Sequence, residues 1–201
     1  MIIGHIPAGY IFSRLAYGRC SNPIGGYRAF LGWGIFGAIA PDLDLLYFYF
    51  VDHGSVPHHK YFTHYPVFWI ALILLSATLF AWKTKGRTFG CYALIFSISG
   101  FLHLILDTIG GSIWWLAPFV DHPFSLTTIL PEFRVWQLNF LFHWSFMFEL
   151  ILVVWASWLW LRKRHSPNPA MAENDIDNRL PSQSSDFIDR HAPVFSSSHP
   201  S

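Results

Sequence analysis

The chain has 201 residues, the size of a single domain, and a net charge of +1. Hydrophobic residues make up 53% of it and charged residues only 12%, whereas soluble domains carry about 25% charged residues. This composition excludes an ordinary soluble protein, and the small net charge predicts no nucleic-acid partner. The sequence predicts an all-α integral membrane bundle of about four to five hydrophobic helices.

The predicted helices follow from apolar runs, because a bilayer core about 30 Å thick needs about 20 apolar residues per helix. Residues 2–18 form a marginal run that contains Pro7 and Arg14. This run either crosses the membrane or lies half-buried against the other helices. Four longer runs follow it, namely residues 29–51, 66–82, 91–109 and 139–161.

The composition changes after Leu161. A basic stretch, Arg162-Lys163-Arg164, precedes a segment over 165–201 that is rich in Ser, Pro, Asn and Asp. Such a segment buries too little apolar surface to offset the entropy lost on ordering. We therefore predict a membrane-embedded domain over residues 1–161 and a disordered polar cytoplasmic tail over residues 162–201, to which a cytoplasmic partner could bind.

The basic residues predict the orientation, because cytoplasmic loops carry an excess of Lys and Arg. If all five runs cross the bilayer, one side carries Arg14, Arg19, Arg28, Lys83, Lys85, Arg87, Arg162, Lys163 and Arg164. The other side carries only Lys60 and Arg134. We therefore expect an integral membrane protein with its N-terminus outside and its C-terminus in the cytoplasm. Cys20 and Cys91 fall near the cytoplasmic side, where thiols usually stay reduced.

In this arrangement every histidine and acid of residues 1–161 falls toward the outer face. A charge at the bilayer centre costs from about 2.5 to more than 10 kcal/mol, so intramembrane acids need partners. Lys60 and Arg134 are too few to neutralise all of these carboxylates. Carboxylates and neutral imidazoles together bind divalent metals such as zinc. The sequence therefore predicts a metal site at one face of the bilayer.

Spacing places two pairs of residues in this site. His103 and Asp107 are four residues apart, which puts both on one face of a helix. They are interpreted as a pair of metal ligands, with a proton relay as the alternative. Asp42 and Asp44 would point apart on an unbroken helix, but Pro41 breaks the helix and an irregular turn can bring them together.

The loop over residues 52–65 is dense in histidine, which alone is a weak metal signal. It contains His58-His59-Lys60-Tyr61-Phe62-Thr63-His64, in which His58 is interpreted as a solvated loop residue. His143 and Glu149 are six residues apart, so a regular helix cannot direct both at one ion. Their role stays open at this point.

Four motifs in this order resemble the YdjM-like family of inner-membrane metal-dependent hydrolases. They are Ile-Gly-His-Ile around His5, Ala-Pro-Asp-Leu-Asp at 40–44, His-Lys-Tyr-Phe-Thr-His at 59–64, and Gly-Phe-Leu-His-Leu-Ile-Leu-Asp-Thr at 100–108. The resemblance covers roughly residues 1–160 and implies a bacterial inner (plasma) membrane as the location. It implies these site residues, with zinc as the expected metal: His5, Asp42, Asp44, His59, His64, His103 and Asp107.

Three positions depart from the family pattern. Lys60 stands where the family has Arg, Tyr61 where it has Gly, and Tyr65 where it has Ser. Lysine lacks the planar fork with which arginine contacts a phosphate through two bonds. Lys60 is therefore expected to balance charge on a substrate rather than to orient it.

The resulting hypothesis is a membrane-bound metal-dependent hydrolase that cleaves a phosphodiester or lipid-linked substrate. A bound metal lowers the pKa of its water to about 7, and Asp44 is the expected general base. The His-x-x-x-Asp element also resembles one in zinc-dependent phospholipases C. The alternative is a non-catalytic membrane scaffold with a structural metal. In that case the tail would recruit a cytoplasmic partner by folding on binding. A structural zinc site closes with four ligands, so the larger donor set here favours the hydrolase. A transporter ranks last, because acids and histidines do not continue to the inner face before the tail.

Overall fold

The fold is described here from a computed structural model that covers residues 3–20, 26–81, 86–127, 129 and 134–164. Within these residues every regular element is a helix, and Ile113 and Phe124 add one isolated antiparallel bridge. The all-α prediction is confirmed. Of the predicted disordered tail over residues 162–201, residues 162–164 belong to the last helix, and residues 165–201 lie outside the described residues.

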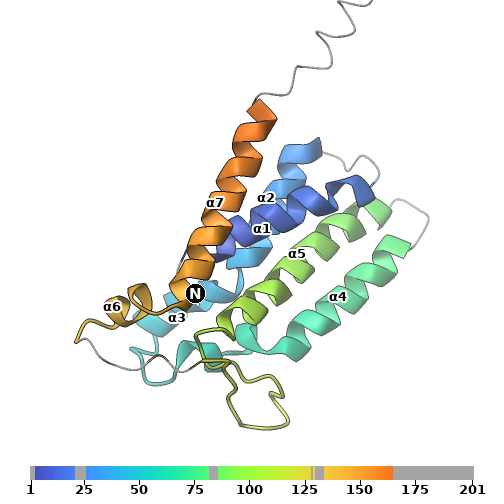
Figure 1. The fold of residues 1–201 in the computed structure, drawn as a ribbon. Helices are drawn as coiled ribbons and strands as arrows, with labels where there is room; N and C mark the ends of the chain where they lie inside the picture. Colours follow the sequence, from blue (N-terminus) through green and yellow to red (C-terminus); the bar gives the residue numbers. More distant parts are fainter. Residues whose placement is uncertain (1–2, 21–25, 82–85, 128, 130–133, 165–201) are drawn as a thin grey trace, which may run out of the picture. The chain divides into compact units, whose positions relative to one another are not determined.

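The helices follow the predicted apolar runs closely. The α-helices are α1 (His5–Ala16), α2 (Gly26–Ile39), α3 (Asp44–Phe50), α4 (Pro66–Ala81), α5 (Gly86–Asp107), α6 (Trp136–Leu141) and α7 (Ser145–Arg164). Four 3₁₀ helices lie between them: η1 (Tyr17–Arg19), η2 (Pro41–Leu43), η3 (His58–Lys60) and η4 (Phe62–His64). In the compact unit Met1–Leu161, α1 packs on α2, α2 on α5 and α5 on α4 (Figure 1).

Pro41 divides the second apolar run as predicted. A proline has no N–H with which to continue the helical hydrogen bonds. Accordingly α2 ends at Ile39, η2 begins at Pro41, and the chain continues as α3 after a bend of 58°. The break lies where Asp42 and Asp44 occur, so both carboxylates stand on irregular backbone rather than on opposite faces of one helix.

The helices differ in length, and therefore in whether they can cross the bilayer core. By length and composition α5 and α7 can each span a membrane, and the bent pair of α2 with η2–α3 makes a third candidate. The 16 residues of α4 and the 12 of α1 rise about 24 and 18 Å, less than a bilayer core of about 30 Å. The length of α1 favours the half-buried alternative for residues 2–18.

Glycines allow the central helices to approach closely. A Cβ at Gly37 of α2 would lie 2.2 Å from the carbonyl oxygen of Phe96 in α5. Similarly, a Cβ at Gly100 of α5 would lie 2.1 Å from the ring of Trp69 in α4. Small residues at such contacts are typical of membrane helices, which gain mainly from close van der Waals packing.

The surface of α7 is apolar along its length. Met147, Ile151, Val154 and Trp158 all expose large apolar side chains. A water-facing helix of a soluble protein rarely presents so continuous an apolar face. A lipid environment accounts for it, in agreement with the membrane prediction.

The two cysteines form a disulfide between Cys20, just after η1, and Cys91 in α5. The expectation of reduced thiols is therefore wrong for this structure. Their Cα atoms are 6.2 Å apart, inside the usual disulfide range of about 4.4–6.8 Å. Arg19 and Arg87 lie at the same end of the bundle. The disulfide and the basic residues favour opposite orientations, because disulfides persist mainly outside the cytoplasm.

A labelling experiment decides between these two indications. If the disulfide forms, a membrane-permeant maleimide will label Cys20 and Cys91 only after the protein has been reduced. The Cys20→Ser variant will then label without reduction, through the freed Cys91. Labelling of the wild type without reduction would instead support reduced thiols and a cytoplasmic position for this end.

Candidate metal centre

The candidate centre lies where four segments meet at one end of the bundle. His5 begins α1, Asp42 lies in η2, His64 ends η4, and the pair His103 and Asp107 lies in the last turns of α5. All but Asp42 are almost completely buried. Residues that are distant in the sequence thus contribute side chains to one small buried volume.

The carboxylate of Asp107 is at the middle of this volume. Its Oδ1 lies 3.1 Å from Nε2 of His5. Its Oδ2 lies 3.1 Å from Nε2 of His103, 3.3 Å from Nε2 of His59 and 3.9 Å from Nε2 of His64. Four imidazoles therefore face one buried carboxylate through the same type of nitrogen.

His103 is held in the tautomer that binds metals through Nε2. Its Nδ1 lies 2.7 Å from the carbonyl oxygen of Ala38. Because a carbonyl only accepts, Nδ1 must carry the proton, which leaves the lone pair on Nε2. That Nε2 is 3.4 Å from Oδ1 of Asp42. Metal-binding histidines commonly have such a partner on the other ring nitrogen.

His64 is held in the same way between the two carboxylates of the broken helix. Its Nδ1 donates to Oδ2 of Asp44 at 2.8 Å, and its Nε2 faces Oδ1 of Asp42 at 3.6 Å. The hydroxyl of Thr63 also donates to Oδ2 of Asp44. Burial alone would lower the pKa of His64, but Asp42 and Asp44 outweigh it and raise that pKa. Asp44 thus orients a ring whose Nε2 points into the centre.

The buried ring nitrogens that converge here lack aligned hydrogen bonds. In the described part of the chain, neither nitrogen of His5 has a hydrogen-bond partner, nor has Nε2 of His64 or of His103. Such buried groups normally find a partner in protein, water or an ion. One ligand atom each from Asp42, His64, His103 and Asp107 lies within 4.8 Å of the other three. Two carboxylates and two imidazoles suit a divalent cation, so these residues fit a metal.

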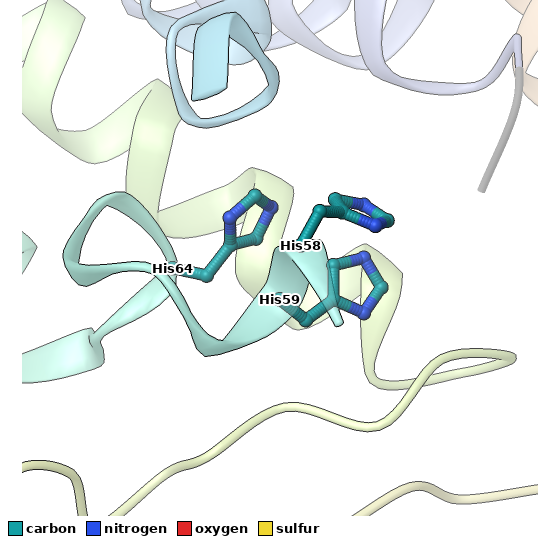
Figure 2. A group of neighbouring side chains, drawn as sticks. All are labelled: His58, His59 and His64. Carbon is teal, nitrogen blue, oxygen red and sulfur yellow. The ribbon is translucent and has the colours of Figure 1, made fainter. Parts of the chain in front are cut away.

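A second group of donors adjoins the first. Figure 2 shows the rings of His58, His59 and His64 beside one another on η3 and η4. Their ligand atoms also lie within 4.8 Å of one another. Burial, with the nearby His59 and His64, lowers the pKa of His58 to about 4, so its imidazole is neutral at pH 7. Half-buried and close to two other imidazoles, His58 is not the solvated loop residue that the sequence suggested.

Comparison with protein families gives one decisive finding. The family described as YdjM inner membrane protein matches residues 1–166. The chain belongs to the YdjM family. No curated protein and no solved structure matches it. The resemblance drawn from the four motifs is confirmed, and the family together with the apolar helices places the chain in a membrane. In this YdjM member the family motifs supply all but one of the clustered donors, the exception being His58.

Lys60 lies at the edge of the centre of this YdjM member. Its ammonium pairs with Oδ2 of Asp121 at 2.9 Å and lies 5.8 Å from the ring centre of Trp114. The indole of Trp114 donates to the other oxygen of Asp121 at 2.7 Å. This contact ties the histidine-rich loop to the segment after α5. The role of Lys60 toward a substrate stays a prediction.

Glu149 of α7 fixes the start of α1, next to His5, and the sequence did not predict this role. Its Oε2 accepts hydrogen bonds from the backbone N–H groups of Ile3 at 2.6 Å and Gly4 at 3.0 Å. These groups stand at the start of α1, where no side chain of α1 caps the helix. A carboxylate at a helix N-terminus is favourable, and here it fixes the backbone next to His5. His143 is separate, because its Nδ1 lies 2.8 Å from the hydroxyl of Ser145 at the start of α7.

Replacing Glu149 with Ala should destabilise the protein by about 1–3 kcal/mol, because two backbone N–H groups lose a buried acceptor. It should also weaken metal binding, because His5, whose Nε2 lies 3.1 Å from the carboxylate of Asp107, loses its fixed position. Thermal unfolding in detergent and metal titration measure the two effects. Asp121→Ala is the control, since Asp121 is exposed and its ion pair is worth at most about 1 kcal/mol. Equal midpoints for the two variants would contradict this role for Glu149.

Proposed function

We propose that this YdjM member is a membrane-bound hydrolase that depends on a divalent metal ion. The observation that carries the proposal is the group formed by Asp42, His64, His103 and Asp107, whose ligand atoms converge at the end of an apolar bundle. Burying two carboxylates there needs compensation. A divalent cation supplies two positive charges, whereas the ammonium of Lys60 pairs with Asp121.

Zinc is the metal that we expect. Imidazole nitrogens and carboxylate oxygens are common zinc ligands, and both kinds are present. A zinc ion acts as a Lewis acid and lowers the pKa of water that it binds to about 7. Asp44 and the Ala38 carbonyl support this chemistry by holding His64 and His103 with Nε2 free.

Asp44 is also the proposed general base. One oxygen, Oδ2, is occupied by His64 and Thr63. The other, Oδ1, is buried and has no hydrogen-bond partner in the described part of the chain. A carboxylate with one anchored and one open oxygen can accept a proton without losing its position.

The position of the centre supports a substrate that belongs to the membrane surface. The donors lie at the end of helices whose sides are apolar, so a polar headgroup can reach them while its chain remains in lipid. We therefore propose a lipid-linked substrate with a phosphodiester as the bond cleaved. A face outside the cytoplasm follows from the basic residues and stays part of this proposal.

Hydrolysis by detergent-purified protein tests this function. The substrates are a chromogenic phosphodiester and phospholipid in mixed micelles, assayed before and after chelation and after zinc is restored. We expect cleavage that is lost on chelation and recovered with zinc. A protein that retains its metal yet cleaves neither substrate would contradict the hydrolase and leave a structural metal.

A further inference from the structure

The centre has more imidazole donors than one ion can use. In the described part of the chain, Asp42, His64, His103 and Asp107 form one group, here called the inner group, whose ligand atoms all lie within 4.8 Å of one another. These four donors already suffice to hold one divalent ion. His58 and His59 lie outside this group although their rings adjoin it.

His58 and His59 are placed to bind a cation together. Their ring centroids are 4.0 Å apart, and their ligand atoms lie within 4.8 Å of each other. Both occur in η3, in a loop that Asp52 braces by accepting bonds from Tyr61 and Val56. Two adjacent imidazoles on a braced turn give a preformed pair of ligands.

His64 cannot serve both groups at once, although its ring is close to each. Its Nδ1 is committed to Asp44, and a single lone pair on Nε2 binds one ion. Asp107 has no such limit, because each oxygen of a carboxylate has two lone pairs and can bridge two ions. Its Oδ2 is 3.3 Å from Nε2 of His59 and 3.1 Å from Nε2 of His103. The carboxylate thus faces a member of each group.

We propose that His58 and His59 bind a second divalent cation, which Asp107 bridges to the ion of the inner group. This inference rests on the proposed metal site and extends it to a pair of ions. Paired ions about 3.5–4 Å apart are typical of phosphatases and nucleases, where they stabilise both the attacking and the leaving oxygen of a phosphoryl group. The second position therefore favours a phosphodiester over a carboxylic ester as substrate.

Manganese titration of full-length, metal-free protein in detergent tests the second position. The number of ions bound at equilibrium gives the stoichiometry, and low-temperature electron paramagnetic resonance shows whether two ions are magnetically coupled. We expect about two coupled ions in the wild type and about one uncoupled ion in His58→Ala. His53→Ala is the matched control, because His53 belongs to the same loop but is exposed. It should behave as the wild type.

The outcomes separate this inference from the proposed function. One bound ion in the wild type, or two coupled ions in His58→Ala, would overturn the second position and leave the inner site intact. No bound ion in the wild type would refute both proposals. If His58→Ala does not fold, His58→Gln replaces it, since the amide keeps a similar size and polarity. The same change from about two ions to one is then expected.

Discussion

The double variant His103→Ala, Asp107→Ala is expected to lose its metal completely during purification. These residues supply two of the four donors of the inner group. The carboxylate of Asp107 also faces the imidazoles of His5, His59, His64 and His103. Loss of a supporting residue alone typically weakens metal affinity about 10–100-fold. Loss of two direct ligands should therefore exceed about 100-fold. Elemental analysis after size-exclusion chromatography measures the remaining metal.

The chain offers a close control for this experiment. Asp121 and His122 are also an acid and a histidine at the same end of the bundle, and both are exposed. The variant Asp121→Ala, His122→Ala removes the same types of side chain and should keep the wild-type metal content. Metal retained after loss of His103 and Asp107 would show that the inner group is not the metal site. Metal lost from both variants would point to a general effect of these substitutions.

The second large effect is expected at Gly37, where α2 and α5 touch. An added Cβ would meet backbone atoms of Phe96 at 2.2, 2.8 and 2.9 Å, and backbone cannot move aside as a side chain can. Gly37→Ala must therefore separate the two helices. Overpacking of this kind costs about 1–3 kcal/mol and occasionally more. Asp42 follows the end of α2 in η2, and His103 lies in the last turns of α5, so metal affinity should fall as well.

Gly32→Ala is the matched control, because Gly32 lies in the same helix and a Cβ there meets nothing within 4 Å. Alanine favours a helix over glycine by up to about 1 kcal/mol, so this variant should be slightly more stable than the wild type. Thermal unfolding in detergent gives both midpoints. Opposite shifts support close packing of α2 on α5, and a Gly37→Ala midpoint at or above that of the wild type would contradict it.

The positions of most helices could be predicted from the sequence, because membrane helices need long apolar runs. The break at Pro41 could also be predicted, since proline removes a helical hydrogen bond wherever it occurs. Helix length was less predictable. The run at 139–161 is divided into α6 and α7, and α7 begins only at Ser145. The division covers residues 142–144, where His143 stands alone between Phe142 and Trp144, and one polar residue does not predict a break.

The residues of the centre were predictable for a different reason. Histidines and acids are rare in apolar segments, and their cost there makes each one informative. Their supports were not predictable. The carbonyl of Ala38 is common to every residue type, and Glu149 acts on backbone N–H groups more than a hundred residues away. His58 was misjudged because a histidine in a polar loop has no distinctive pattern, and only the folded loop shows it beside His59.

The hydrogen bonds between Glu149 and the start of α1 also affect when, during synthesis, the metal site can form. The two partners are separated by 146 residues, so at about 5–20 residues per second the ribosome needs roughly 7–30 seconds to make the second after the first. Until α7 is inserted, the N–H groups of Ile3 and Gly4 lack this acceptor and His5 is not yet fixed. A nascent chain that ends before α7 can contain every proposed metal ligand and still bind its metal poorly.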